Sequence, residues 1–103
     1  MLIVLTTVET AEAGERLGEM IVGEGLVACV QVLPPMTSIY VWDGEVKRAR
    51  EHLLLIKTMP EKWRQLRDFI EANHPYDVPE IVAVESCHVS DGYAAWVDQV
   101  VRE

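Results

Sequence analysis

The sequence has little that would suit a disulfide-stapled, membrane-spanning or nucleic-acid-binding protein. It has only two cysteines, Cys29 and Cys87, too few for the disulfide framework of a small secreted domain. Apolar runs such as residues 2–5 and 53–56 are far shorter than the ~20 residues that cross a bilayer. The 9 basic residues stand against 17 acidic ones, so the net charge of −8 provides no broad positive field for nucleic acid or anionic lipid. We therefore expect no nucleic-acid partner and no membrane association.

The chain opens MLIVLTTVETAE, without a basic segment before the apolar run and without a small-residue cleavage site. This opening predicts a cytoplasmic protein, in which a reducing environment keeps both thiols free. Half of the 103 residues are apolar and 25% are charged, a balance typical of a folded chain. The length predicts one domain over residues 1–103.

The spacing of apolar residues predicts strands and helices in the order β-α-β-β-α-β-α. This order matches the ferredoxin-like split β-α-β sandwich of the α+β class, with a long β-hairpin and an extra C-terminal helix. The expected elements are a strand at residues 2–7, a helix from Thr10 to Gly23 or Gly25, a strand within 26–33, a hairpin of 37–42 with 45–58, a helix after 58, a strand at 81–84 and a helix from Ser90.

Short motifs refine the middle of this pattern. Asp43-Gly44 between two strand-like runs favours a two-residue hairpin turn, in which Trp42 faces Glu45. Residues 58–61, Thr-Met-Pro-Glu, have the form of a capping box and predict a helix start there. His74-Pro75 should end that helix, because the proline ring disfavours helical geometry at the preceding residue.

Several predicted strands are apolar on both faces, which a lone ferredoxin-like sheet does not need. Helices cover only one face of such a sheet, yet the runs at residues 2–5, 26–30 and 53–56 have no polar side. The helix-free face must therefore also be covered. In so short a chain, other copies of the same chain are the expected cover.

No motif for catalysis or structural zinc is present. Residues 23–28 fit the letters of a dinucleotide fingerprint, but they close a helix instead of opening one, so a helix end and turn are expected. No Gly-x-Ser-x-Gly occurs, and we predict that the chain is not an enzyme. The cysteines and histidines lack the local spacing of zinc ligands, and Cys29 is expected to be a buried thiol.

Charged and aromatic residues each allow two interpretations. Seven of the nine basic residues fall between Lys47 and Arg67, where they form either a solvated hairpin and helix face or an anion-binding groove. Tyr40, Trp42, Tyr76 and Trp96 either line a pocket or form an interface, and an interface is the favoured role for the hairpin aromatics.

Particular phrases of the sequence resemble the CutA divalent-cation tolerance family nearly from end to end. They are residues 26–30 (LVACV), 37–45 (TSIYVWDGE), 56–58 (IKT) and above all 74–81 (HPYDVPEI), closed by Tyr93 and Trp96. The resemblance implies one ferredoxin-like domain, assembled as a homotrimer by long hairpins that extend onto neighbouring subunits. It also implies a non-catalytic protein of divalent-cation tolerance that responds to metal ions.

The resemblance further implies copper or another divalent cation as a ligand, with no required cofactor. The ligand set suggested for some family members falls on Thr6, Asn73 and His74. Thr6 stands where those members have Cys, and Asn73 stands where they have a second His. His74 is therefore the predicted metal ligand, and the missing sulfur argues against a soft Cu(I) site.

Two functions remain open at this point. The first is a trimeric metal-responsive protein that binds a divalent cation through His74 and nearby carboxylates or carbonyls. The second resembles the PII-type trimers, which bind anionic small molecules in clefts between subunits. In that case the basic segment at residues 47–67 would supply the positive charge.

Overall fold

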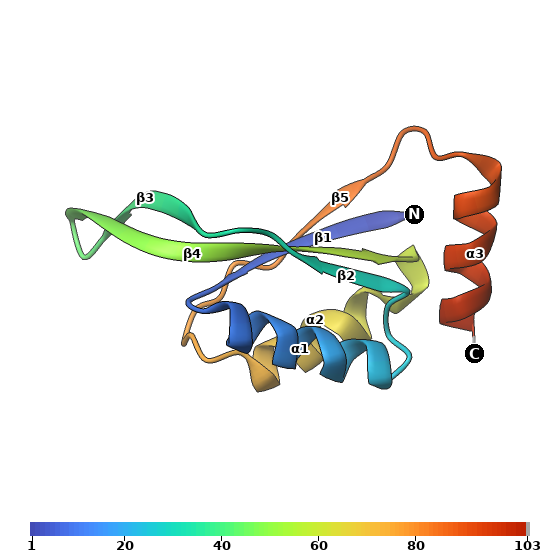
Figure 1. The fold of residues 1–103 in the computed structure, drawn as a ribbon, viewed down its shortest axis with the longest axis horizontal. Coiled ribbons are helices and arrows are strands. Elements are labelled where there is room, and N and C mark those ends of the chain that lie inside the picture. Colours follow the sequence, from blue (N-terminus) through green and yellow to red (C-terminus); the bar gives the residue numbers. More distant parts are fainter. Residues whose placement is uncertain (103) are drawn as a thin grey trace.

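The computed structural model describes residues 1–102, and its sheet is built around the long strand β4 (Glu45–Thr58). β1 (Leu2–Val8) and β2 (Cys29–Val32) pair antiparallel with the two sides of β4. β5 (Val82–Glu85) pairs with the free side of β1, which gives the strand order β2-β4-β1-β5. The structure confirms the predicted α+β class and ferredoxin-like strand order (Figure 1).

The first half of β4 extends beyond the sheet as one strand of a hairpin. β3 (Met36–Trp42) pairs with residues 45–51 of β4, and we call residues 36–51 the arm. Asp43 and Gly44 have φ angles of 52° and 75°, as a turn that matches the twist of its strands requires. Trp42 lies opposite Glu45, so the predicted register is confirmed. The arm projects away from the helices and contributes to a longest dimension of 44 Å (Figure 1).

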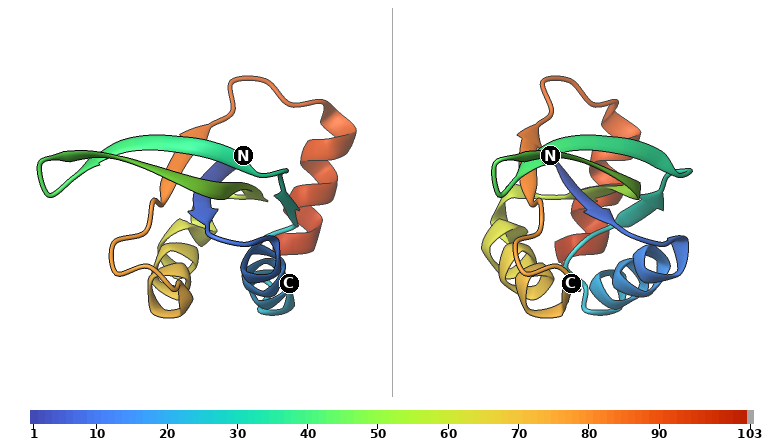
Figure 2. Two further views of the ribbon diagram at one scale, coloured as in Figure 1. Left: turned by 60° about the vertical axis from the view of Figure 1, so that its left-hand side comes forward. Right: turned by 90° about the vertical axis from the view of Figure 1, so that its left-hand side faces the viewer.

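Helices α1 (Ala11–Gly23) and α2 (Trp63–Asn73) lie on the same face of the sheet (Figures 1 and 2). The Thr10 side chain accepts a hydrogen bond from the Ala13 amide and caps α1, as predicted. Beyond α1, Gly25 has a φ of 72° and the Leu26 amide donates to the carbonyl oxygen of Ile21. This arrangement is a glycine helix end, which confirms that residues 23–28 are not a dinucleotide fingerprint.

The core lies between these two helices and the sheet. Residues 0–3% exposed come from both layers: Val4, Val8, Leu54 and Ile56 from the strands, and Leu17, Ile21, Leu66 and Ile70 from the helices. Gly14 allows α1 to approach the sheet closely, because a Cβ added there would lie 3.1 Å from the side chains of Leu54 and Val8. Burial of the apolar residues stabilises this contact by ~25 cal/mol per Å² removed from water.

The capping-box prediction was wrong. Thr58 is the last residue of β4, and its buried hydroxyl donates to the carbonyl oxygen of Leu26 at 2.8 Å. The next turn is a 3-10 helix (Pro60–Lys62) with Met59 at its N-cap, and α2 follows directly. The end of α2 agrees with prediction, because His74 is extended after the last helical residue.

Helix α3 (Asp91–Arg102) lies at the end of the sheet away from the arm (Figure 1). Val97 and Val101 are buried, whereas Tyr93 and Trp96 are 37% and 45% exposed. Within residues 1–102, no helix is both long and apolar enough to span a membrane. Ile3 and Leu5 of β1, which alternate with buried Val4, are only partly buried. The face of the sheet opposite α1 and α2 is therefore incompletely covered by the chain itself.

Candidate functional site

The predicted ligand His74 lies where α2 ends beside β1, and it is only 9% exposed. Its Nε2 is 2.9 Å from the Thr7 carbonyl oxygen, and its Nδ1 is 3.0 Å from the Tyr76 amide nitrogen. Because a carbonyl can only accept and an amide can only donate, Nε2 carries the proton and the ring is neutral. Burial lowers the pKa of His74 below 6.5, against the opposing effects of the Thr7 carbonyl and Glu51.

The other two positions of the implied ligand set do not complete a metal site with His74. Thr6 is fully buried in β1, and its hydroxyl has no hydrogen-bond partner among the described residues. The Asn73 amide returns to its own helix, donating to the Phe69 carbonyl oxygen at 2.8 Å. Among residues 1–102, no three His, Cys, Asp or Glu side chains are placed to share one metal ion. The role of His74 as a metal ligand stays a prediction.

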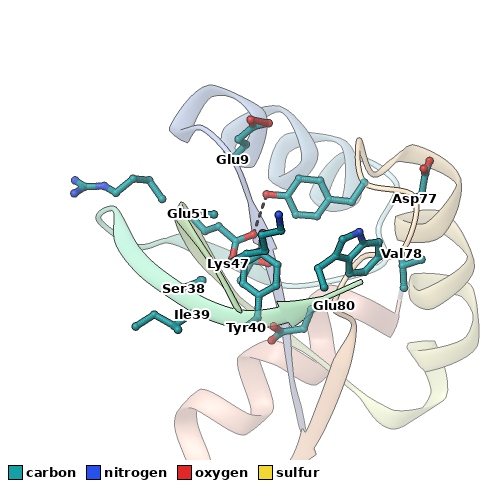
Figure 3. A pocket seen from close by; sticks show the side chains of 14 residues that line it. Glu9, Ser38, Ile39, Tyr40, Lys47, Glu51, Asp77, Val78 and Glu80 are labelled. Atoms are coloured by element: carbon teal, nitrogen blue, oxygen red, sulfur yellow. Dashed lines mark hydrogen bonds between the residues drawn. The ribbon is translucent and has the colours of Figure 1, made fainter. Parts of the chain in front are cut away.

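The loop after His74 forms one wall of a cleft of about 740 Å³ at the base of the arm (Figure 3). The arm forms the opposite wall with Tyr40, Trp42 and Lys47 among other residues. The Tyr76 hydroxyl crosses from the loop to the arm, where it donates to Oε2 of Glu51 at 2.9 Å, drawn as the dashed line in Figure 3. Burial, and then the neighbouring Glu51 carboxylate, raise the pKa of Tyr76 well above 10, so the hydroxyl keeps its proton.

The His74 and Tyr76 rings support each other beside this cleft. Their centroids are 4.8 Å apart and their planes are tilted by 56°. Together with the Tyr76 amide on Nδ1, this contact fixes the path of the chain as it leaves α2. His74 therefore positions the loop that holds Tyr76 against Glu51.

Sequence reasoning missed Glu9 and Glu51, which are distant in the sequence but line the same cleft. The pairing of β1 with β4 brings them together, since Val8 lies opposite His52 in the register. No local pattern in the sequence predicts this register between β1 and β4. Glu51 lies in the middle of the predicted strand 45–58, so the sequence alone gave no signal that it would lie beside Glu9.

The cleft has more acidic than basic side chains. Its carboxylates belong to Glu9, Glu51, Asp77 and Glu80, and its cations are Lys47 and Arg50. The Lys47 amine lies 2.9 Å from the carboxylate of Glu45, which compensates part of its charge.

The basic segment expected at residues 47–67 does not form one anion-binding groove. Lys47 and Lys57 stand about 33 Å apart along β4, at about 3.3 Å per residue. The basic residues after them, Lys62, Arg64 and Arg67, lie in or just before α2. Only Lys47 and Arg50 of this set line the cleft. The distribution therefore fits a solvated strand and helix face better than an anion-binding groove.

Both cysteines are free thiols away from the cleft. Cys29 is partly buried in β2 rather than fully buried as expected, and Cys87 is exposed. Tyr93 of α3 lies close enough to Cys29 for a hydrogen bond, and burial followed by this neighbour raises the pKa of Tyr93. The contact between Cys29 of β2 and Tyr93 of α3 therefore helps to hold α3 against the sheet.

A comparison with protein families decides the classification. The family model described as CutA1 divalent ion tolerance protein matches residues 2–100. The chain belongs to this family. The resemblance found in residues 74–81 and the other phrases is thereby confirmed.

Relatives within the CutA1 family include plant and bacterial proteins. The chain is 41% identical to the chloroplastic protein CutA of Arabidopsis thaliana over 98% of its own length and 56% of that protein. It is 41% identical to the divalent-cation tolerance protein CutA of Thermus thermophilus over 92% of both chains. It thus spans little more than half of the plant relative and nearly all of the bacterial one.

Solved CutA1 structures share the fold closely. The crystal structure of CutA1 from Oryza sativa has a TM-score of 0.94 to this chain at 39% identity, covering 99% of this chain and 94% of the rice chain. The Thermus thermophilus protein has a TM-score of 0.90 and covers 94% and 95% of the two chains. These likenesses extend over the arm and all three helices, so the ferredoxin-like fold is that of the CutA1 family.

Proposed function

We propose that this CutA1-family chain is a divalent-cation tolerance protein that works as a homotrimer and binds a divalent cation, copper among them, without catalysing a reaction. The observation that carries the proposal is the family match over residues 2–100. The Thermus thermophilus relative, matched over 92% of both chains, is named for the same role. The acidic cleft at the base of the arm agrees with a cationic ligand and disfavours the PII-like alternative of an anionic one.

His74 is the proposed ligand to the cation. Both of its ring nitrogens are engaged, so a metal ion must displace the Tyr76 amide from Nδ1 or the Thr7 carbonyl from Nε2. Displacing a hydrogen bond costs about 1 kcal/mol, which favours weak binding. Glu51 is a neighbouring carboxylate, since it acts on the pKa of His74 and accepts the Tyr76 hydroxyl beside it. Imidazole and carboxylate together suit Cu(II) better than Cu(I).

Calorimetric titration with Cu(II) tests this proposal. The native protein should bind copper weakly, and binding should weaken as the pH falls because protons compete for the imidazole. His74→Ala should lose the binding. His88→Ala is the matched control, since His88 is an exposed imidazole on a loop, and this variant should bind like the native protein. Equal copper affinity in the native protein and His74→Ala would contradict the proposal.

A further inference from the structure

The arm leaves the sheet at one point of β4. Val8 lies opposite His52, so the pairing of β4 with β1 ends there, and β2 pairs with residues 54–57. From Glu51 to the turn, β3 is the strand paired with β4 in the part of the chain that the structure describes. The direction of the arm relative to the sheet is therefore set at residues 51 and 52, which we call the root.

Two side-chain hydrogen bonds fasten the root. Nδ1 of His52 is 2.8 Å from the carbonyl oxygen of Leu33, so this bond joins β4 to the segment that leads into β3 and stays within the hairpin. The other bond comes from outside the hairpin. The Tyr76 hydroxyl, on the loop after α2, donates to Oε2 of Glu51 at 2.9 Å (Figure 3). This second bond therefore ties the arm to the body of the molecule.

The loop that carries Tyr76 is itself held firmly to β1. The His74 ring donates from Nε2 to the Thr7 carbonyl oxygen at 2.9 Å, and its Nδ1 accepts from the Tyr76 amide at 3.0 Å. The rings of His74 and Tyr76 also lie against each other, with centroids 4.8 Å apart. The Tyr76–Glu51 bond is partly buried, and a hydrogen bond to a carboxylate is stronger than one between neutral groups. It therefore connects the arm to a fixed point.

The arm acts as a lever about this root. Six residues separate Glu51 from Glu45, which lies opposite Trp42, so the arm extends about 20 Å at about 3.3 Å per residue. A rotation of about 15° at the root moves the tip by about 5 Å, close to the spacing of about 4.8 Å between paired strands. A small change at Glu51 is therefore enough to displace the tip from a surface that it should meet.

We propose that the Tyr76–Glu51 hydrogen bond is a strap that holds the arm in the direction needed to meet a second copy of the chain. The inference rests on the homotrimer of the proposed function and adds that assembly depends on a contact inside each chain. Without the strap, the arm would sample several directions, and association would have to restrict them at a cost in affinity. Tyr76 and Glu51 are thus positioning residues, which act on assembly through the arm.

Hydrogen exchange of the assembled protein, without added metal, tests the strap. Tyr76→Phe removes the hydroxyl and keeps the ring that contacts His74. The arm amides should exchange about tenfold faster in this variant, as loss of one bond to a charged group implies, while amides of β1 and α1 keep their native rates. Glu51→Ala should behave like Tyr76→Phe. Glu51→Gln keeps an oxygen that can accept the Tyr76 hydroxyl, and its arm should exchange within about threefold of the native rate.

Light scattering of dilution series in sub-denaturing urea follows assembly in the same variants. Tyr76→Phe and Glu51→Ala should each dissociate at about tenfold higher protein concentration than the native protein. The double variant should be no worse than either single one, because both changes remove the same bond. The matched control is Tyr93→Phe, which removes a hydroxyl from α3 at the end of the sheet away from the arm and should leave arm exchange unchanged (Figure 1).

Three results would overturn the strap: native exchange of the arm in Tyr76→Phe, equal acceleration in the arm and α1, or additive effects in the double variant. The homotrimer has a separate test. A native protein with the mass of one chain would contradict the proposed function, whereas a native trimer that Tyr76→Phe leaves unaltered would contradict the strap alone.

Discussion

At the scale of single residues, His74 connects the end of α2 to the strand beside it. Its Nε2 donates to the Thr7 carbonyl and its Nδ1 accepts from the Tyr76 amide, a pattern that only the neutral ring can make. Protonation would place a second N–H opposite the Tyr76 N–H. Protonation of His74 would therefore affect both the end of α2 and the loop that lines the cleft.

This arrangement predicts a loss of stability at mildly acidic pH. The pKa of His74 is lowered from 6.5 by burial, so the unfolded chain takes up the proton at a higher pH than the folded chain. The free energy of unfolding should therefore fall as the pH drops through 6.5 toward the lowered folded pKa. Above that window, His74 should contribute no pH dependence.

Urea unfolding at about pH 7.5 and about pH 5.5 measures this effect. His74→Gln should lose less stability between the two pH values than the native protein does. His88→Gln replaces an exposed histidine and should keep the native pH dependence. If His74→Gln and the native protein lose stability equally, His74 is not the group responsible.

At the scale of elements, local sequence signals predicted most helices and strands. They failed where a contact between residues distant in the sequence determines the structure. The Thr10 cap of α1 and the Trp42–Glu45 register depend on neighbouring residues, and both are confirmed. Thr58 has the right sequence for a capping box, but its hydroxyl is taken by the carbonyl oxygen of Leu26. That partner lies across the fold, where no local pattern reveals it.

The apolar side chains of the arm are poorly buried by the chain itself. Ile39, Val41 and Val46 are 62%, 68% and 73% exposed, and Trp42 is 52% exposed. Apolar side chains on a projecting hairpin are costly to leave in water. A two-stranded hairpin is also marginal by itself, so the arm needs a surface to rest on.

Trp42→Ala should therefore weaken assembly. Burial of an aromatic side chain of this size at an interface contributes about 2 kcal/mol or more, and truncation loses it. Light scattering at decreasing concentration should show the variant dissociating before the native protein, with a lower melting temperature. Val22→Ala, which shortens an exposed side chain of α1, should change neither property. Unchanged mass and melting of Trp42→Ala would count against an interface role.

At the scale of the whole molecule, the candidate site shows what sequence reasoning could and could not reach. His74 and the aromatic residues were identified because they stand in recognisable phrases. Glu9 and Glu51 were not, because only the register that sets Val8 opposite His52 brings them to one cleft. The sequence left the basic segment open between a groove and a solvated face, because only the extended path of β4, which separates Lys47 and Lys57 by about 33 Å, decides between them.

The molecule has open strand edges to which another chain can pair. Along the arm, β3 is paired with β4 on one side only, and β5 at the sheet edge is paired with β1 only, among the described strands. Val82 and Val84 on β5 are 47% and 49% exposed. An open strand edge binds another strand by backbone hydrogen bonds. Different surfaces that meet head to tail form a closed ring when the rotation between copies allows it.

We therefore expect the protein in solution to be a homotrimer without a stable folded monomer. Light scattering at micromolar concentration should give three times the 11.6 kDa of one chain, because obligate interfaces are large and apolar. Val84→Lys tests the edge directly, since a charge on an exposed edge strand opposes pairing with another strand. Val22→Lys is the matched control on α1 and should leave the mass unchanged. A native protein that stays folded with the mass of one chain would overturn the expectation, since the exposed arm and the half-covered sheet would then be stable without any partner.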